Sequence, residues 1–280
     1  MSATAVPRPA PPSLFAAARR VFELSFGEML WSRRTIFMAL VVGGPVLLAV
    51  IFRVVETFGM PAMRVNGARV AGPSIFGVMI WMLYVRFIVP VLGVFYGTAL
   101  MADEVEDKTL TYLFTRPIPR GAVLLGKYLA YLACTSLVVL PSVMLTYFLV
   151  VPFGQVAGTF VSLVADLAIL GLGLAVYGAV FAFVGARLKR PLVSGLIFAF
   201  GWEQLAMALP GYLRQFTVAH YLQALVPHAM PSDGALSIVQ GLFRQAPPVP
   251  VALGWLAAFL VAFLWLAMRT VARREYVLEQ

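Results

Sequence analysis

The stretch EVEDKTLTYLFTRPIPRGAVLLGKYLA, Glu104 to Ala130, passes from an acidic segment through two prolines into a long apolar run. Pro117 and Pro119 each remove a backbone donor and restrict the residue before them, so one regular helix is not expected to cross this point. The apolar run continues to Val151 and exceeds the ~20 residues with which a helix crosses a bilayer. The stretch therefore predicts a polar segment, a rigid corner and then a membrane-spanning helix.

The same stretch has the spacing of a phosphate-binding P-loop, because Gly121 is followed after four residues by Gly126 and Lys127. A working P-loop follows a strand, exposes its backbone amides to phosphate and ends in a Ser or Thr whose hydroxyl binds magnesium. Here the spacing follows a proline corner, enters an apolar run and ends in Tyr128. We therefore expect this chain to bind no nucleotide and no other cofactor.

Composition places the chain among integral membrane proteins. Its 280 residues are 61% hydrophobic and 12% charged, with a mean hydropathy of +0.91, whereas soluble domains are about half apolar and a quarter charged. The net charge of +9 does not indicate nucleic-acid binding, because the basic residues cluster at the ends of apolar runs. The single cysteine, Cys134, excludes an intrachain disulfide.

Six apolar segments predict six membrane spans and an all-α membrane fold. These are roughly Ile36–Phe52, Val78–Met101, Val123–Val151, Val156–Val184, Leu192–Leu209 and Val249–Met268. Six spans place both termini on one side of the membrane, and the segments on that side hold most of the Lys and Arg residues. Because cytoplasmic segments are enriched in these residues, we expect a multi-pass protein of the cytoplasmic membrane with both termini inside.

The remaining segments complete one predicted domain, residues 14–280, after a proline-rich tail at 1–13 that we expect to be disordered. An amphipathic surface helix is predicted over Leu14–Trp31, with Ser13 as its cap. A cytoplasmic coupling segment is expected at 102–121, and a large outer loop at 210–248. Because acidic residues suit the first turn of a helix, we expect a short amphipathic helix over Asp103–Phe114 within the coupling segment.

The stretch Glu104–Ala130 resembles the corresponding segment of bacterial type-two ABC permeases, the membrane subunits of ABC exporters. The residues that carry the resemblance are, in order, Glu104, Glu106, Thr109, Leu110, Pro117, Arg120, Leu125, Gly126 and Lys127. The sequence departs from the pattern at Lys108, where many members carry glycine. In that family the segment forms a coupling helix that docks on a separate ATPase subunit.

The resemblance implies a set of partners and functional residues. The ATPase-coupling residues would be Asp103, Glu104, Glu106, Asp107, Thr109, Leu110, Leu113 and Phe114, and the corner residues would be Pro117, Pro119 and Arg120. The partners would be two copies of a cytoplasmic ATPase, which binds ATP and magnesium, and a second permease copy, identical or related. Membrane lipids and additional periplasmic or membrane subunits are compatible with this assembly, in the bacterial inner membrane.

A carboxylate inside the fourth predicted span is a second candidate functional residue. Asp166 has apolar neighbours, and a charge at that depth costs ~2.5–3.5 kcal/mol on insertion scales, so it should face the bundle or a wet cavity. It is either a translocation-path or proton-linked group, or an acid that lies near the outer interface or is hydrogen-bonded within the bundle. Arg86, Glu203 and Arg214 are possible partners of Asp166 near the membrane interface, and we interpret them as charges that only anchor the ends of spans.

Other functions stay open beside the exporter permease. A secondary transporter would use Asp166 directly, and a mechanotransmission or assembly subunit of an ABC complex would transmit ATP-driven motion without moving a solute. An enzyme is not expected, because no nucleophile and base have a catalytic spacing. A metal site is not expected either, because His220 and His228, the only two histidines, have no cysteine or acid at ligand spacing.

Overall fold

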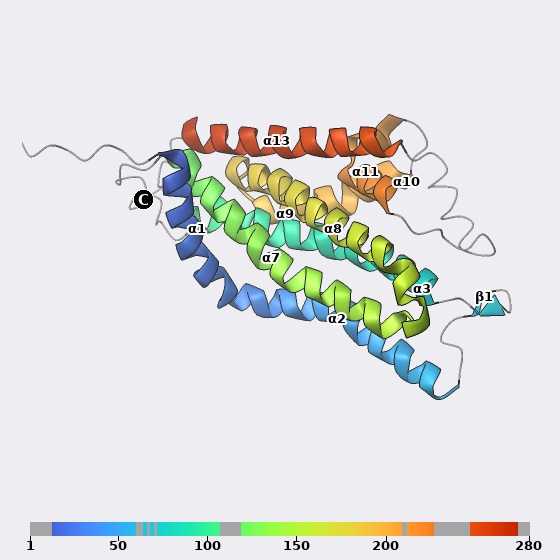
Figure 1. Ribbon diagram of the computed structural model, residues 1–280. Coiled ribbons are helices and arrows are strands. Elements are labelled where there is room, and N and C mark those ends of the chain that lie inside the picture. Colours follow the sequence, from blue (N-terminus) through green and yellow to red (C-terminus); the bar gives the residue numbers. More distant parts are fainter. Residues whose placement is uncertain are drawn as a thin grey trace, which may run out of the picture.

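The computed structural model describes residues 13–59, 64–65, 68–69, 72–106, 119–208, 212–226 and 247–273. Helices make up almost all of this part, so the predicted all-α membrane fold is confirmed (Figure 1). The strands in the described residues are β1 (Arg64–Val65) and β2 (Ala68–Arg69), which pair antiparallel with Arg64 opposite Arg69. They follow the helix of the first span.

The helices run nearly parallel or antiparallel in one bundle, apart from α1 at one end (Figure 1). The larger helices are α1 (Leu14–Leu30), α2 (Arg33–Thr57), α7 (Arg120–Val150), α8 (Phe153–Arg187) and α13 (Val249–Arg273). The second span comprises α3 (Gly72–Met79), η1 (Ile80–Ile88), α4 (Val89–Leu92), η2 (Gly93–Gly97) and α5 (Ala99–Glu106), and the later short elements are α9 (Pro191–Leu196), η3 (Ile197–Trp202), α10 (Glu203–Ala208), η4 (Tyr212–Phe216) and α11 (Val218–Leu225).

Within the described residues, five helices are long and apolar enough to cross a membrane. They are Arg34–Thr57, Gly72–Ala102, Arg120–Val150, Phe153–Arg187 and Val249–Arg273. The predicted fifth span, Leu192–Leu209, corresponds to the consecutive elements α9, η3 and α10, which are not among the five. The count of six spans therefore stays a prediction, while the other five predicted spans each fall on a suitable helix.

The predicted N-terminal helix is confirmed as α1, and its position along the membrane surface stays a prediction. The Ser13 hydroxyl accepts a hydrogen bond from the Ala16 amide at 3.4 Å, which satisfies one of the free donors at the helix start. Arg19 and Glu23, one turn apart on the exposed side, form an ion pair at 3.0 Å. Helix α1 runs at a steep angle to α2 and crosses α7 near the start of that helix (Figure 1).

The core of the bundle lies around α8, which packs against α7 and α13 and against the second span. Two buried tyrosines of α7 donate hydrogen bonds to carbonyls of α8: Tyr128 to Ala175 at 2.8 Å and Tyr131 to Leu174 at 2.9 Å. A Cβ added at Gly178 would overlap the Tyr131 ring. Small residues of α8 therefore serve close packing within the subunit, as small residues at helical spacing commonly do in membranes.

Candidate functional site: the coupling end and a buried carboxylate

The start of α7 agrees with the predicted proline corner. Pro119 has an extended ψ of 125° and precedes the first helical residue, Arg120, and its carbonyl accepts a hydrogen bond from the Ala122 amide at 2.8 Å. Proline suits this place because it has no amide proton, and the first amides of a helix lack intrahelical partners. Pro117, the first of the three predicted corner residues, lies outside the described residues.

The predicted acidic helix starts earlier than the sequence suggested. We expected a helix to begin at Asp103, but Asp103, Glu104 and Glu106 lie in α5, which starts at Ala99 and follows the helical run of the second span. No glycine or proline interrupts the chain between Gly97 and these acids, so nothing ends the helix before them. The structure describes the backbone of these three residues. The other predicted coupling residues, Asp107, Thr109, Leu110, Leu113 and Phe114, lie outside the described residues.

Helix α1 crosses α7 at a glycine. A Cβ added at Gly126 would lie 2.5 Å from the Ala18 carbonyl oxygen and 2.7 Å from Val21 Cβ, so only glycine fits without moving one of the helices. Ala17, Ala18 and Ala122 are buried in the same contact. Gly126 belongs to the P-loop-like spacing, and its role in this structure is a close helix crossing.

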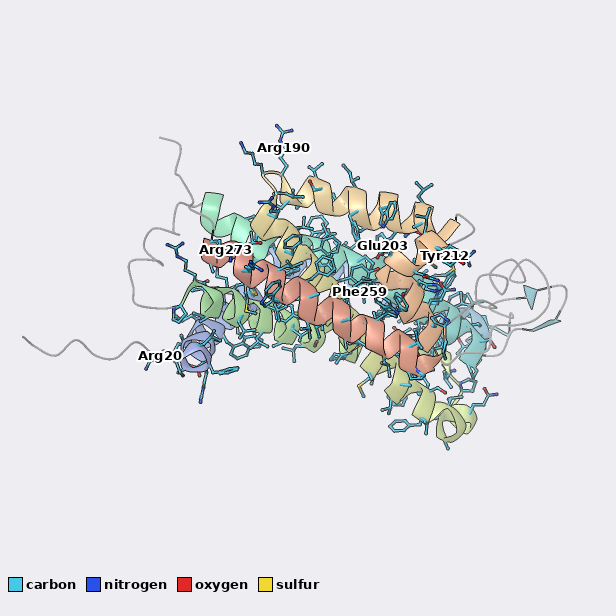
Figure 2. The ribbon with its side chains drawn as sticks, turned by 90° about the horizontal axis from the view of Figure 1, so that it is seen from above. Arg20, Arg190, Glu203, Tyr212, Phe259 and Arg273 are labelled. Carbon is cyan, nitrogen blue, oxygen red and sulfur yellow. The ribbon has the colours of Figure 1, made fainter. Side chains whose placement is uncertain are left out.

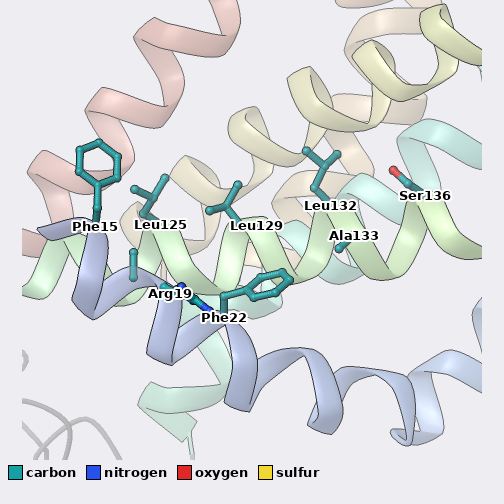
Figure 3. A pocket seen from close by; sticks show the side chains of 9 residues that line it. Phe15, Arg19, Phe22, Leu125, Leu129, Leu132, Ala133 and Ser136 are labelled. Atoms are coloured by element: carbon teal, nitrogen blue, oxygen red, sulfur yellow. The ribbon is translucent and has the colours of Figure 1, made fainter.

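A groove opens beside this crossing, between α1 and α7 (Figure 3). Its volume is ≈ 710 Å³, and its walls are apolar except for Arg19 and Ser136. The rings of Phe15 and Phe22 extend from α1 along it. The groove and the crossing together show that α1 is packed against the start of the third span as well as lying at the surface.

The second span is also packed closely against α8, at the point where its last helix, α5, begins. A Cβ added at Gly185 of α8 would overlap the backbone carbonyl of Thr98, the residue directly before α5. Gly97 is equally close to α8, because a Cβ there would lie 2.8 Å from Phe181 Cβ. Thus the residue directly before α5 is packed closely against α8, and the first turns of α7 are packed closely against α1.

Basic residues gather at this end of the molecule. Figure 2 shows Arg20, Arg190 and Arg273 at one end of the bundle and Tyr212 at the opposite end. The three arginines are exposed and come from α1, the α8–α9 connection and α13. We call this the basic end. It also contains the start of α7.

Asp166 is fully buried in α8, with 0% of its surface exposed. The carboxylate therefore faces the bundle, as the cost of placing it against lipid predicts. Its role in translocation remains a prediction.

A second buried carboxylate lies in α10, where the interpretation as an anchor of a span end was wrong. Glu203 is 2% exposed and accepts a hydrogen bond from the Tyr177 hydroxyl of α8. Its other oxygen, Oε1, accepts from the backbone amide of Val218 at 3.1 Å, at the first residue of α11. One carboxylate therefore joins three helices that are distant in sequence.

Arg86 extends this polar cluster toward the second span. Its Nε donates to Gln204 Oε1 at 2.9 Å, and its guanidinium lies 5.5 Å from the centre of the Trp81 ring. Arg86 is partly buried between these groups, so its interpretation as a simple end anchor is also wrong. We call Arg86, Tyr177, Glu203 and Gln204 the polar cluster.

Comparison with known families decides the class of protein. The model of the ABC-2 family transporter proteins matches residues 18–271, which is nearly the whole chain. The chain belongs to the ABC-2 transporter family. Comparison with curated proteins gave no match. The protein is therefore a multi-pass membrane permease subunit of an ABC transporter, and the resemblance found in Glu104–Ala130 is confirmed at the level of the family.

In this ABC-2 permease the described residues include no group of three or more His, Cys, Asp or Glu side chains that could hold a metal. His220 of α11 lies in the predicted outer loop, and burial, and secondly the charge of Arg214, lowers its pKa from the ordinary value. The polar cluster forms hydrogen bonds between helices.

Two features of the permease were missed in the sequence. The close approach at Gly126 has no sequence signal of its own, because the sequence does not show which helix crosses α7 at this glycine. Glu203 did have a signal: it lies inside the predicted span Leu192–Leu209, and an acid within an apolar span indicates a buried partner.

Proposed function

We propose that this permease is the transmembrane subunit of an ATP-driven exporter and that it couples to a separate cytoplasmic ATPase through segment 102–121. The observation that supports this is the way the segment is attached. It leaves the second span through α5 without a break and enters the third span directly after Pro119. A force on the segment is therefore applied to two core helices.

Close packing around the start of α5 and the start of α7 favours transmission of this force. The Thr98 carbonyl is packed against Gly185, and Gly126 is packed against Ala18, so neither helix has room to yield at its base. Closely packed contacts transmit displacement instead of absorbing it. Closure of the ATPase would thus move α5 with α8, and α7 with α1.

The assembly that we propose has two permease copies, identical or related, and two ATPase copies that bind the ATP and magnesium. The solute path would lie between the two bundles, with Asp166 as a candidate residue of that path. The basic end would face the cytoplasm of a bacterial cell, which the positive-inside rule supports. Periplasmic or further membrane subunits are compatible with this arrangement.

The coupling role is tested by Glu104→Ala, Glu106→Ala and Leu110→Ala, made singly and together in the permease expressed with its ATPase. We expect normal amounts in the membrane, but loss of ATPase copurification or of ATPase stimulation by the permease. The matched control is Glu56→Ala, because Glu56 is an acid in the last turn of α2 and lies outside segment 102–121. Unchanged copurification and turnover in the triple variant would refute the proposal.

The alternative of a mechanotransmission subunit gives the same ATPase result, so it needs a second measurement. Vesicles that contain the assembled complex are loaded with a panel of lipids, peptides and drugs, and ATP-dependent loss of each cargo is followed. Export of one cargo by the native complex, abolished by the triple variant, supports the exporter. ATP hydrolysis without transport of any cargo supports the alternative.

A further inference from the structure

A second basic feature lies at the same end of the permease, between the last turns of α8 and α13. It is a hollow of ≈ 280 Å³, lined by Arg187, Leu266, Arg269, Thr270 and Arg273. Three of the five lining residues are arginines, and none is acidic. We call it the arginine hollow.

The positions of the arginines are set by the two helices. Arg187 is the last residue of α8, and Arg269 and Arg273 are one turn apart on α13, so they share a face of that helix. Helices α8 and α13 pack along each other, which fixes the distance between the two groups of charges. Among the residues that the structure describes, no ion pair involves Arg187, Arg269 or Arg273.

The hollow has an apolar side as well as a charged one. Leu266 forms one wall, and Trp265, which is 51% exposed, lies one residue earlier on α13. The Arg269 guanidinium lies 4.9 Å from the centre of the Trp265 ring, a cation–π contact that restricts the arginine side chain. Tryptophan and arginine together are typical of the depth at which lipid headgroups meet the hydrocarbon.

We propose that the arginine hollow binds the headgroup of an anionic phospholipid. Guanidinium groups bind phosphate oxygens through two parallel hydrogen bonds, and basic hollows between membrane helices suit acidic headgroups. The apolar wall favours a lipid over a soluble phosphate, because the start of an acyl chain can contact Leu266 and Trp265. The lipid would bridge α8 and α13. Which leaflet supplies the lipid depends on the proposed orientation of the permease, whereas the binding itself does not.

The test uses the purified full-length permease in neutral detergent and a tail-labelled phosphatidylglycerol, whose fluorescence anisotropy reports binding. We expect unlabelled phosphatidylglycerol to compete, and phosphatidylcholine and soluble glycerol phosphate to compete weakly. Replacing Arg187, Arg269 or Arg273 with Gln should weaken binding roughly fivefold for each arginine removed. Arg20→Gln is the matched control, since Arg20 is an exposed arginine of α1 at the same end.

Each other outcome overturns the proposal in a defined way. Equal competition by glycerol phosphate would indicate a site for free phosphate, and equal competition by phosphatidylcholine would indicate general lipid adsorption. An equal loss in Arg20→Gln would indicate a diffuse charge effect. If the triple Gln variant does not fold, the triple Lys variant keeps the charges but not the paired hydrogen bonds. It should bind more weakly than the native chain, and native-like binding by it would refute the site. ATPase coupling is not measured here, so this result and that of the coupling test are independent.

Discussion

At the crossing of α1 and α7, the Ala18 carbonyl occupies the space beside Gly126, and the contact is made of backbone and small apolar groups. At the junction of α8, α10 and α11, the contact depends on the carboxylate of Glu203, which accepts hydrogen bonds from Tyr177 and Val218. The first contact is sensitive to added volume and the second to lost polarity. Two junctions in one bundle therefore have different vulnerabilities.

The largest effect is expected at the carboxylate. Glu203→Ala should lower the free energy of unfolding by about 3 kcal/mol, because it leaves the Tyr177 hydroxyl and the Val218 amide buried without their acceptor. Glu203→Gln should lose less, since the amide oxygen can still accept from Val218. Denaturant titration in mixed micelles measures both, with Glu23→Ala, an exposed acid, as the control. Equal stability of Glu203→Ala and the native chain would show that the cluster does not hold α11.

An intermediate effect is expected at the crossing. Gly126→Ala should cost about 2 kcal/mol, the order expected for overpacking, because its Cβ meets the backbone of α1. Gly121→Ala is the matched control on the same helix, since the nearest atom to its added Cβ is Met268 Cβ at 3.9 Å. It should be neutral or stabilising, because alanine is the better helix former. If both alanine variants unfold alike, the crossing is not close.

The smallest effect is expected at Tyr128, whose hydroxyl forms one hydrogen bond between α7 and α8. Tyr128→Phe removes the hydroxyl that donates to Ala175 at 2.8 Å, and should cost about 1 kcal/mol, the usual net value of one neutral hydrogen bond. The same denaturant titration measures it. A loss as large as that of Glu203→Ala would mean that α7, too, is held mainly by polar contacts, and the contrast between the two junctions would fail.

Much of the fold could be predicted because it depends on local patterns. Apolar length identified five of the spans, and Ser13 identified the start of α1. The start of α7 after Pro119 followed from the chemistry of proline alone. Each of these features depends on residues within a few positions of one another.

The features that the sequence did not reveal depend on distant residues. Gly126 and Ala18 are far apart in the chain, and so are Glu203 and Tyr177, so no periodicity marks either contact. The start of α5 at Ala99 was missed for another reason. Acidic residues favour a helix start, but nothing in the preceding residues ends the helix already under way. A local preference was outweighed by the continuity of the second span.

The buried carboxylate has a consequence for biosynthesis. The ribosome makes Tyr177 before Glu203 and Val218 after it, so the two hydrogen-bond donors become available at different times. When the segment Pro191–Ala208 has just been made, its acid can pair with the tyrosine of the helix before it, while the amide of α11 has not yet left the ribosome. The carboxylate therefore completes its hydrogen bonds only after the translation of residues beyond the segment. Truncation of the chain before Val218 would leave a helix with half of the polar contacts that its acid needs.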